Sequence, residues 1–194
     1  MSCPPAQALM LPLSTSTLVD LSSCVVEGQV AGLSSRWTAD GSSIVTEVTV
    51  EVTDALLGET NCVTFLYEGG VVGDIGQRVS DMPAVATNQQ VLVFLREMSE
   101  REKARDNSSK TAPEKRYMLS GSAQGFCRIE GGRAIKGDFT VLETPATRAA
   151  TVISNGSPVV ADDPSVVEHN VDLTELKTRI RQRIKEKHQP GSTP

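Results

Sequence analysis

Residues 24–56, CVVEGQVAGLSSRWTADGSSIVTEVTVEVTDAL, contain the pattern that decides the fold. Along residues 44–56 valine alternates with threonine and glutamate, and this period of two indicates a strand with one buried and one solvated face. The preceding TADGSS, residues 38–43, is a turn whose Asp-Gly pair favours a hairpin. The first strand, residues 24–37, holds two interior glycines of the kind that mark a bulge or the bend of a barrel.

Shorter segments on both sides of this hairpin complete the predicted domain. Residues 14–23 suit a short capped helix, and residues 68–90 form a glycine-rich crossing. Residues 99–116 are dense in charge and lack an apolar anchor, so a solvated insertion is expected there. Further strands are expected at 62–70 and 91–98, with two more within 117–137.

These elements predict a mainly β fold, a small barrel of five to six strands with a short N-terminal helix and a separate C-terminal amphipathic helix. A flat two-sheet sandwich is the alternative, but it usually needs seven strands. The predicted divisions are 1–8 (residual signal-peptide end or disordered tail), 9–143 (barrel), 144–171 (flexible linker), 172–188 (C-terminal helix) and 189–194 (disordered tail).

The C-terminal helix carries an apolar stripe and six basic residues. Docking of the stripe on the barrel or on a partner is the favoured interpretation, with the charges facing outward. Contact with an anionic membrane surface is the alternative, but a tryptophan or phenylalanine anchor is missing. The candidate docking residues are Leu173, Leu176, Ile180 and Ile184.

Composition bounds the functions that are expected. A net charge of −5 and 4% aromatic residues argue against binding of nucleic acid. No run approaches 18 apolar residues, so no transmembrane segment is expected. The four cysteines form no C-x-x-C pair and the two histidines lie near the C-terminus, so neither a metal site nor a cofactor is expected.

Three stretches, STLVDLSSCVVEGQV, LLGETNCVTFLYEGGVVGDIGQRVSDMPAVATNQQVLVFL and GSAQGFCRI, resemble a family of bacterial exported proteins of unassigned function. The resemblance covers residues 9–142, although residues 83–88 lack the family's aromatic residue and glycine. The strand order is also similar to the OB-type barrel of tissue inhibitors of metalloproteinases and netrin-like modules, which implies an OB-like fold. Those inhibitors coordinate the protease zinc through an N-terminal cysteine, and this chain offers no residue for that role.

The sequence AQA at 6–8 fits the small-x-small pattern before a signal-peptidase site. Exported proteins of the similar family commonly carry this pattern across their cleavage point. Both observations predict a secreted or periplasmic protein whose mature chain begins at Leu9; a cytoplasmic protein with a disordered tail is the alternative. After export three cysteines remain, Cys24, Cys62 and Cys127. They form either one disulfide with an odd thiol or unpaired buried thiols, and the sequence does not decide which two would pair.

Common catalytic arrangements lack the residues that they need. No histidine lies within residues 14–142, so a serine or cysteine nucleophile has no histidine base. The sequence GGVVGDIG, residues 69–76, matches neither the dinucleotide fingerprint nor the phosphate loop. Asp74 in this loop is the one acid of interest because loops carry function, although a turn-forming role is the simpler interpretation.

The leading hypothesis is therefore a non-enzymatic, exported module that binds a protein or cell-envelope partner. A protease inhibitor of the metalloproteinase-inhibitor barrel class is the alternative, and a carboxylate enzyme centred on Asp74 is a third hypothesis. Trp37, beside Arg36, is expected to fill the barrel end or to belong to a binding patch. The candidate partner-binding residues are Arg36, Trp37, Gly69, Gly70, Gly73, Asp74 and Gly76.

Overall fold

The computed structural model of the chain describes residues 11–58, 61–79, 82–106, 115–137 and 168–188, and the backbone of two short strands at 151–154 and 157–160. The predicted tails 1–8 and 189–194 lie outside these residues. The helices described are α1 (Thr15–Asp20), α2 (Glu100–Arg105) and α3 (Leu173–Lys187). The strands are β1 (Cys24–Trp37), β2 (Ile44–Leu57), β3 (Cys62–Glu68), β4 (Gly70–Val72), β5 (Ile75–Gln77), β6 (Gln90–Glu97), β7 (Tyr117–Leu119), β8 (Phe126–Glu130), β9 (Arg133–Lys136), β10 (Thr151–Ser154), β11 (Ser157–Val160) and β12 (Asn170–Asp172).

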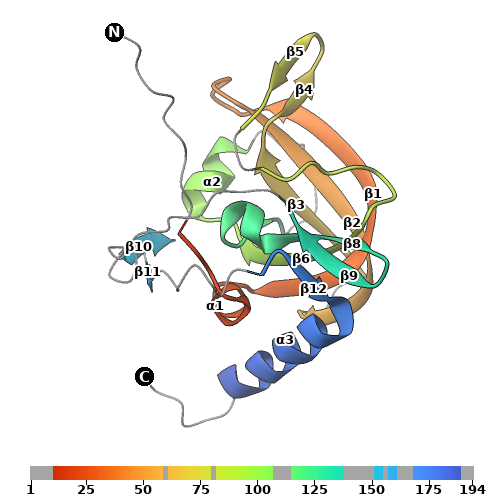
Figure 1. Ribbon diagram of the computed structural model, residues 1–194. Helices are drawn as coiled ribbons and strands as arrows, with labels where there is room; N and C mark the ends of the chain where they lie inside the picture. The colour runs from red at the N-terminus through yellow and green to blue at the C-terminus, as the bar shows by residue number, and fades with distance from the viewer. Residues whose placement is uncertain are drawn as a thin grey trace, which may run out of the picture.

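Five strands close into a barrel (Figure 1). Around the ring β1 pairs with β2, β2 with β3, β3 with β7, β7 with β6, and β6 with β1. Only the pairing of β3 with β7 is parallel among these five. Beyond the ring, β6 also pairs with β8, and the sheet continues through β9 to β12. The predicted mainly β barrel with a short N-terminal and a C-terminal helix is thus confirmed.

The first strand closes the ring because it is long and bent. Residues Cys24–Gln29 of β1 pair with β6, while β1 also pairs with β2 along almost its whole length. The register between β1 and β2 shifts directly before Gly28. A Cβ on Gly28 would lie 2.2 Å from the Glu51 carbonyl oxygen, so only glycine fits this bulge. The interior glycine bends the strand as the sequence predicts.

Two apolar cores lie on the two faces of the sheet. The inner core fills the barrel and includes Val26, Val48 and Phe65. The outer core lies on the outside of β1 and β6, where Val25 and its neighbours meet α1 and α3. Because successive strand residues point to opposite faces, Val25 and Val26 serve different cores. Both faces of β1 are therefore apolar at this end of the strand. In a strand with one face in solvent, apolar and polar residues would alternate instead.

A buried glutamine holds the segment that precedes α1 on the outer core. Gln124, 2% exposed, accepts a hydrogen bond from the Leu13 N–H (2.9 Å) and donates one to the Leu11 carbonyl (2.7 Å). Gly121 has a φ of +64°, and a Cβ there would lie 2.6 Å from Leu13 Cδ1. The motif GSAQGF thus supplies both the amide and the space that this segment needs.

The charged insertion at 99–116 is not wholly solvated, contrary to the prediction. Ser99 caps α2 and forms a capping box with Glu102, whose side chain also pairs with Arg96 (2.6 Å). The side chains of Asp106 and Arg116 are only 7% and 9% exposed and pair with each other. The prediction of a solvated segment from charge density is wrong here, because the charged side chains form ion pairs with other residues of the chain. Residues 107–114 lie outside the described part.

Other segments differ in detail. Residues 117–137 form three strands, not two, because the 3-10 helix Ser122–Gly125 separates β7 from the β8–β9 hairpin. The predicted linker contains the hairpin of β10 and β11, and at its end β12 pairs with β9. Asp172 then caps α3, accepting hydrogen bonds from the Thr174 and Glu175 N–H groups. The C-terminal helix consequently follows directly from the sheet and packs on it.

Candidate functional site

The hairpin of β4 and β5 projects from the barrel, within the crossing predicted at 68–90 (Figure 1). Its two-residue turn is Gly73-Asp74, and the φ of Gly73, +60°, is the positive value that such tight hairpin turns require at their first position. Val71 is 65% exposed and Ile75 54% exposed. Of the described residues, only these two and Leu33 are large apolar side chains counted as exposed. The hairpin therefore presents uncovered apolar surface at its tip.

Hydrogen bonds fix the base of the hairpin to β2. The Gly69 N–H donates to the Ile44 carbonyl (2.8 Å), and the Ile44 N–H donates to Gln77 Oε1 (2.6 Å). Thr46 donates its hydroxyl to the Gly69 carbonyl (2.6 Å). These bonds join both arms of the hairpin to Ile44 and Thr46 of β2. They therefore fix the direction in which the hairpin projects from the barrel.

Gly70 lies where the hairpin crosses closest to the barrel. Its φ is +138°, and a Cβ there would lie 2.3 Å from Thr46 Oγ1 and 2.5 Å from Ser35 Oγ. Both the backbone conformation and the available space therefore require glycine. Of the other candidate glycines, Gly69 and Gly73 also have positive φ. Gly76 does not, and a Cβ there would have only Val71 within 4 Å.

The candidate residues on β1 lie near the hairpin but have different roles. Trp37 ends β1 opposite Ile44, the residue that anchors the hairpin, and is half-buried. Arg36 instead pairs with Glu47 (3.2 Å) and Asp106 (2.6 Å). The structure thus brings Trp37 and the hairpin base together around Ile44, while the guanidinium of Arg36 is occupied by two carboxylates.

Arg36 belongs to a four-residue ion cluster that sequence reasoning missed. Arg116 also pairs with Glu47 (3.2 Å) and with Asp106, so two cations and two carboxylates neutralise each other. The alternation along residues 44–56 predicts a solvated glutamate at position 47, but the Glu47 side chain is only 22% exposed. No sequence pattern indicates that Arg36 of β1, Glu47 of β2, Asp106 and Arg116 come together. The cluster is closed by its own charges and offers none to a ligand.

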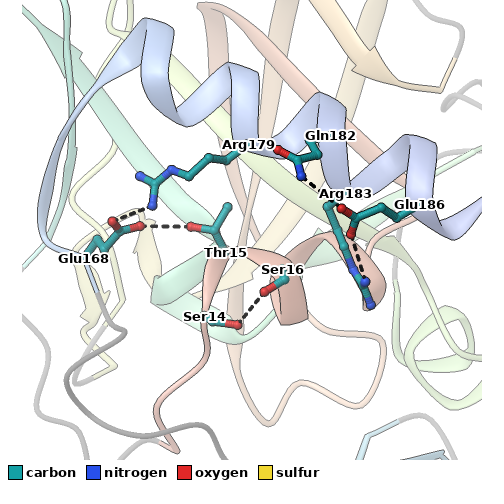
Figure 2. A pocket seen from close by; sticks show the side chains of 8 residues that line it. All are labelled: Ser14, Thr15, Ser16, Glu168, Arg179, Gln182, Arg183 and Glu186. Atoms are coloured by element: carbon teal, nitrogen blue, oxygen red, sulfur yellow. Dashed lines mark hydrogen bonds and ion pairs between the residues drawn. The ribbon is translucent and has the colours of Figure 1, made fainter. Parts of the chain in front are cut away.

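A pocket of about 430 Å³ lies between α1 and α3 (Figure 2). Arg179 donates to Glu168 (2.7 Å), which also accepts a hydrogen bond from Thr15. Arg183 pairs with Asp20 (2.6 Å) and with Glu186 (3.3 Å). Each guanidinium already has a carboxylate partner, so the pocket is a polar seam between two packed helices. Its lining residues are Ser14, Thr15, Ser16, Glu168, Arg179, Gln182, Arg183 and Glu186.

The apolar stripe of α3 faces the barrel. Leu176 and Ile180 are buried in the outer core, and Leu173 and Ile184 are partly buried against it. Lys177 pairs with Glu27 of β1 (2.6 Å) and with Asp54 of β2, which also pairs with Arg181 (2.8 Å). The hydrogen bond from Lys177, together with the charges of Lys177 and Arg181, holds the pKa of Asp54 below its usual value despite partial burial. Much of the helix's positive charge is thus directed at acids of the same chain.

The remaining reactive side chains form no catalytic arrangement among the described residues. Burial raises the pKa of the Cys24 and Cys127 thiols to about 11, so both are protonated at neutral pH. Cys24 lies in the inner core and Cys127 in the outer core. Asp74 is exposed at the hairpin turn. No set of three or more His, Cys, Asp or Glu side chains in the described part is placed to hold a metal ion.

None of the helices in the described residues has both the length and the apolar character needed to cross a membrane. Comparison of the chain with protein-family models, curated proteins and solved structures gives no match. The resemblances noted in the sequence therefore rest on the motifs and the strand order of this chain alone, and the structure itself shows a closed five-stranded barrel.

Proposed function

We propose that this protein is a non-enzymatic, exported binding module and that the β4–β5 hairpin is its contact with a protein partner, of the cell envelope or secreted. One observation carries the proposal: Val71 and Ile75 are 65% and 54% exposed on a hairpin whose base is fixed to the barrel. Exposed apolar side chains on a projecting element mark interaction sites, because their burial on binding is favourable.

The rigid base strengthens the proposal. An isolated two-stranded hairpin is marginally stable in water, and ordering it on binding would cost free energy. Here the bonds of Gly69 and Gln77 to Ile44 and Thr46 of the barrel hold the hairpin before a partner arrives. The free energy of burying Val71 and Ile75 is then available for binding.

The proposal places the contact on the hairpin, and not on a membrane-binding C-terminal helix. Lys177, Arg179, Arg181 and Arg183 of α3 are paired with carboxylates of the chain, and the apolar stripe packs on the barrel. A helix that binds membranes needs its apolar face and its cations available to the lipid. On α3 the apolar face is covered by the barrel, and most of the cations are already paired.

We further propose an OB-type barrel of the kind found in metalloproteinase inhibitors and netrin-like modules. The support is the ring order β1, β2, β3, β7, β6 with its single parallel pairing, together with the resemblance of the sequence motifs. Protease inhibition is the second candidate function, favoured by the narrow tip with Val71 and Ile75 on either side of a two-residue turn. A narrow tip of this kind can enter the active-site cleft of a protease, whereas a flat surface cannot.

The test is a binding assay with a photo-reactive residue in place of Val71, using envelope and secreted fractions of the source cells. The expected result is one defined cross-linked partner, whose binding to the unlabelled protein is lost with Val71→Ser and Ile75→Ser combined. Leu33→Ser, at an exposed apolar side chain of β1, is the matched control and should retain binding. Equal binding by the double variant would overturn the proposal, and a protease panel decides whether the partner is inhibited.

A further inference from the structure

The outer edge of β5 pairs with no other strand in the described part of the chain. β4 and β5 form a two-stranded sheet by themselves, with Val72 opposite Ile75 and Val71 opposite Gly76. The pair that flanks a two-residue turn exchanges both hydrogen bonds, and such pairs alternate along an antiparallel ladder. The N–H and C=O of Gly76 therefore point away from β4, toward solvent. An exposed edge of this kind is a template for another strand.

Two opposite charges flank Gly76 at equal distances along the chain. Asp74 lies two residues before it and Arg78 two residues after it, and both are exposed. Within the described residues neither side chain forms an ion pair, in contrast to Arg36, Arg116 and most of the basic side chains of α3. Gly76 has no Cβ, and only Val71 lies within 4 Å of the place where one would be. A second backbone can therefore approach this edge closely.

We propose that the β5 edge pairs with the β5 edge of a second copy of this chain, antiparallel and centred on Gly76. A two-fold axis that is perpendicular to the sheet and lies midway between the two copies of Gly76 places these glycines opposite each other. It also places each Asp74 opposite the other copy's Arg78. The edge is thus self-complementary, as a symmetric dimer contact must be. Opposite charges directly across an antiparallel pair stabilise it.

Pairing joins two hairpins into a four-stranded sheet and doubles the apolar surface near the tip. The two Val71 side chains then share one face of the sheet, and the two Ile75 side chains share the other. The contact involves a few residues from each copy, far below the roughly 1,200 Å² of a stable interface, so a weak and reversible dimer is expected. This inference rests on the proposed function, in which the hairpin is the contact element, and makes that element a paired one.

A contrasting explanation of the charges is that they protect the edge from pairing, as charged residues do on many exposed strands. The two explanations predict opposite effects of neutral substitution. If Asp74 and Arg78 attract each other across the dimer, replacing both by serine weakens association. If they keep copies apart, the same change strengthens association.

The experiment is sedimentation equilibrium of the full chain over a concentration series up to about 1 mM, the range in which weak contacts are populated. The wild type is expected to dimerise. Asp74→Arg and Arg78→Asp should each weaken the dimer about tenfold or more, because like charges then face each other. The combined D74R/R78D variant should restore the wild-type constant to within about threefold. Circular dichroism checks that all variants are folded, which is expected because both positions are exposed.

Three results would overturn the proposal: a monomer at every concentration, single substitutions without effect on the dimer, or stronger association of D74S/R78S. Partner binding is measured separately on the wild type, as described above. A dimer that follows the charge pattern while no partner is cross-linked overturns the proposed function alone. A cross-linked partner together with a wild type that stays monomeric overturns this inference alone.

Discussion

The helix α3 and the β4–β5 hairpin are both attached to the barrel (Figure 1). Their apolar side chains differ in exposure, since those of α3 are buried and those of the hairpin are not. On α3, Leu176 and Ile180 are 3% and 0% exposed, and the surrounding cations pair with acids of α1, β1 and β2. On the hairpin, Val71 and Ile75 contact little and remain exposed. The helix is thus part of the fold, whereas the hairpin carries surface that folding leaves uncovered.

The attachments differ as well. The helix is held by side chains, through an apolar stripe and ion pairs. The hairpin is held by its backbone, through Gly69 and Gly70, and by the amide of Gln77. Substitutions should therefore affect the two elements by different physical routes, and the expected effects fall in a definite order.

The largest effect is expected in α3. Ile180→Ala or Leu176→Ala leaves a cavity in the outer core and should lower the free energy of unfolding by about 2–5 kcal/mol. Urea unfolding measures it, with Thr178→Ala on the exposed face of the same helix as the control. A loss below about 1 kcal/mol for Ile180→Ala would mean that α3 does not complete the core.

The next effect is expected at the base of the hairpin. Gly70→Ala combines a disfavoured φ with contacts to Thr46 and Ser35, and should cost about 2–3 kcal/mol. Gly73→Ala is the matched control, since it has a positive φ but no neighbour within 4 Å, and should cost about 1 kcal/mol. Unfolding gives the totals, and amide hydrogen exchange of residues 71–77 shows where the protection is lost. Equal costs would contradict the close-approach explanation.

A smaller, pH-dependent effect is expected at the ion pairs of α3. Lys177→Met removes the ion-pair partner of Glu27 and leaves Asp54 with Arg181 alone, and should cost about 1–2 kcal/mol at neutral pH. Because the folded pKa of Asp54 is lowered, its contribution is present above its usual value of 3.8 and is lost as the pH falls through the folded pKa. The difference between variant and wild type should therefore shrink below pH 3.8. Lys185→Met, at an exposed lysine, should show no such trend.

The smallest effect on stability is expected at the hairpin tip. Val71→Ser with Ile75→Ser should change the free energy of unfolding by less than about 0.5 kcal/mol, because both side chains are already solvated. The same double variant is expected to abolish partner binding. A stability loss above about 1 kcal/mol would show that these side chains belong to the fold, and the contrast between helix and hairpin would fail.

The sequence predicted elements that have a sustained period. The alternation in β2 and the three-and-four spacing of Leu173, Leu176, Ile180 and Ile184 repeat often enough to stand out. The hairpin strands have three residues each and include glycines, so no period could reveal them. The sequence indicates the glycines of this hairpin as candidate site residues, but it does not indicate Val71 and Ile75. Their exposure depends on which surfaces the rest of the fold leaves uncovered.

Partners distant along the chain were beyond sequence reasoning. Arg36 and Arg116 meet through Glu47 and Asp106, and Gln124 meets Leu11 and Leu13, only after the barrel brings these segments together. The charges at 99–116 indicated a solvated segment because charge alone carries no information about a partner's position. The start of the helix at Glu100–Arg105, in contrast, is marked by a local sequence pattern, because its capping residues Ser99 and Glu102 are three residues apart.

The outer core has a consequence for the order in which the chain folds during synthesis. Asp20 of α1 pairs with Arg183 of α3 across 163 positions, whereas the inner core needs no residue beyond β8. The barrel can therefore close on the ribosome while the outward side chains of β1 and β6, such as Val25 and Phe94, still lack their cover. Until α3 emerges, these side chains form a transient apolar surface that a chaperone can bind, and the docking of α3 removes it.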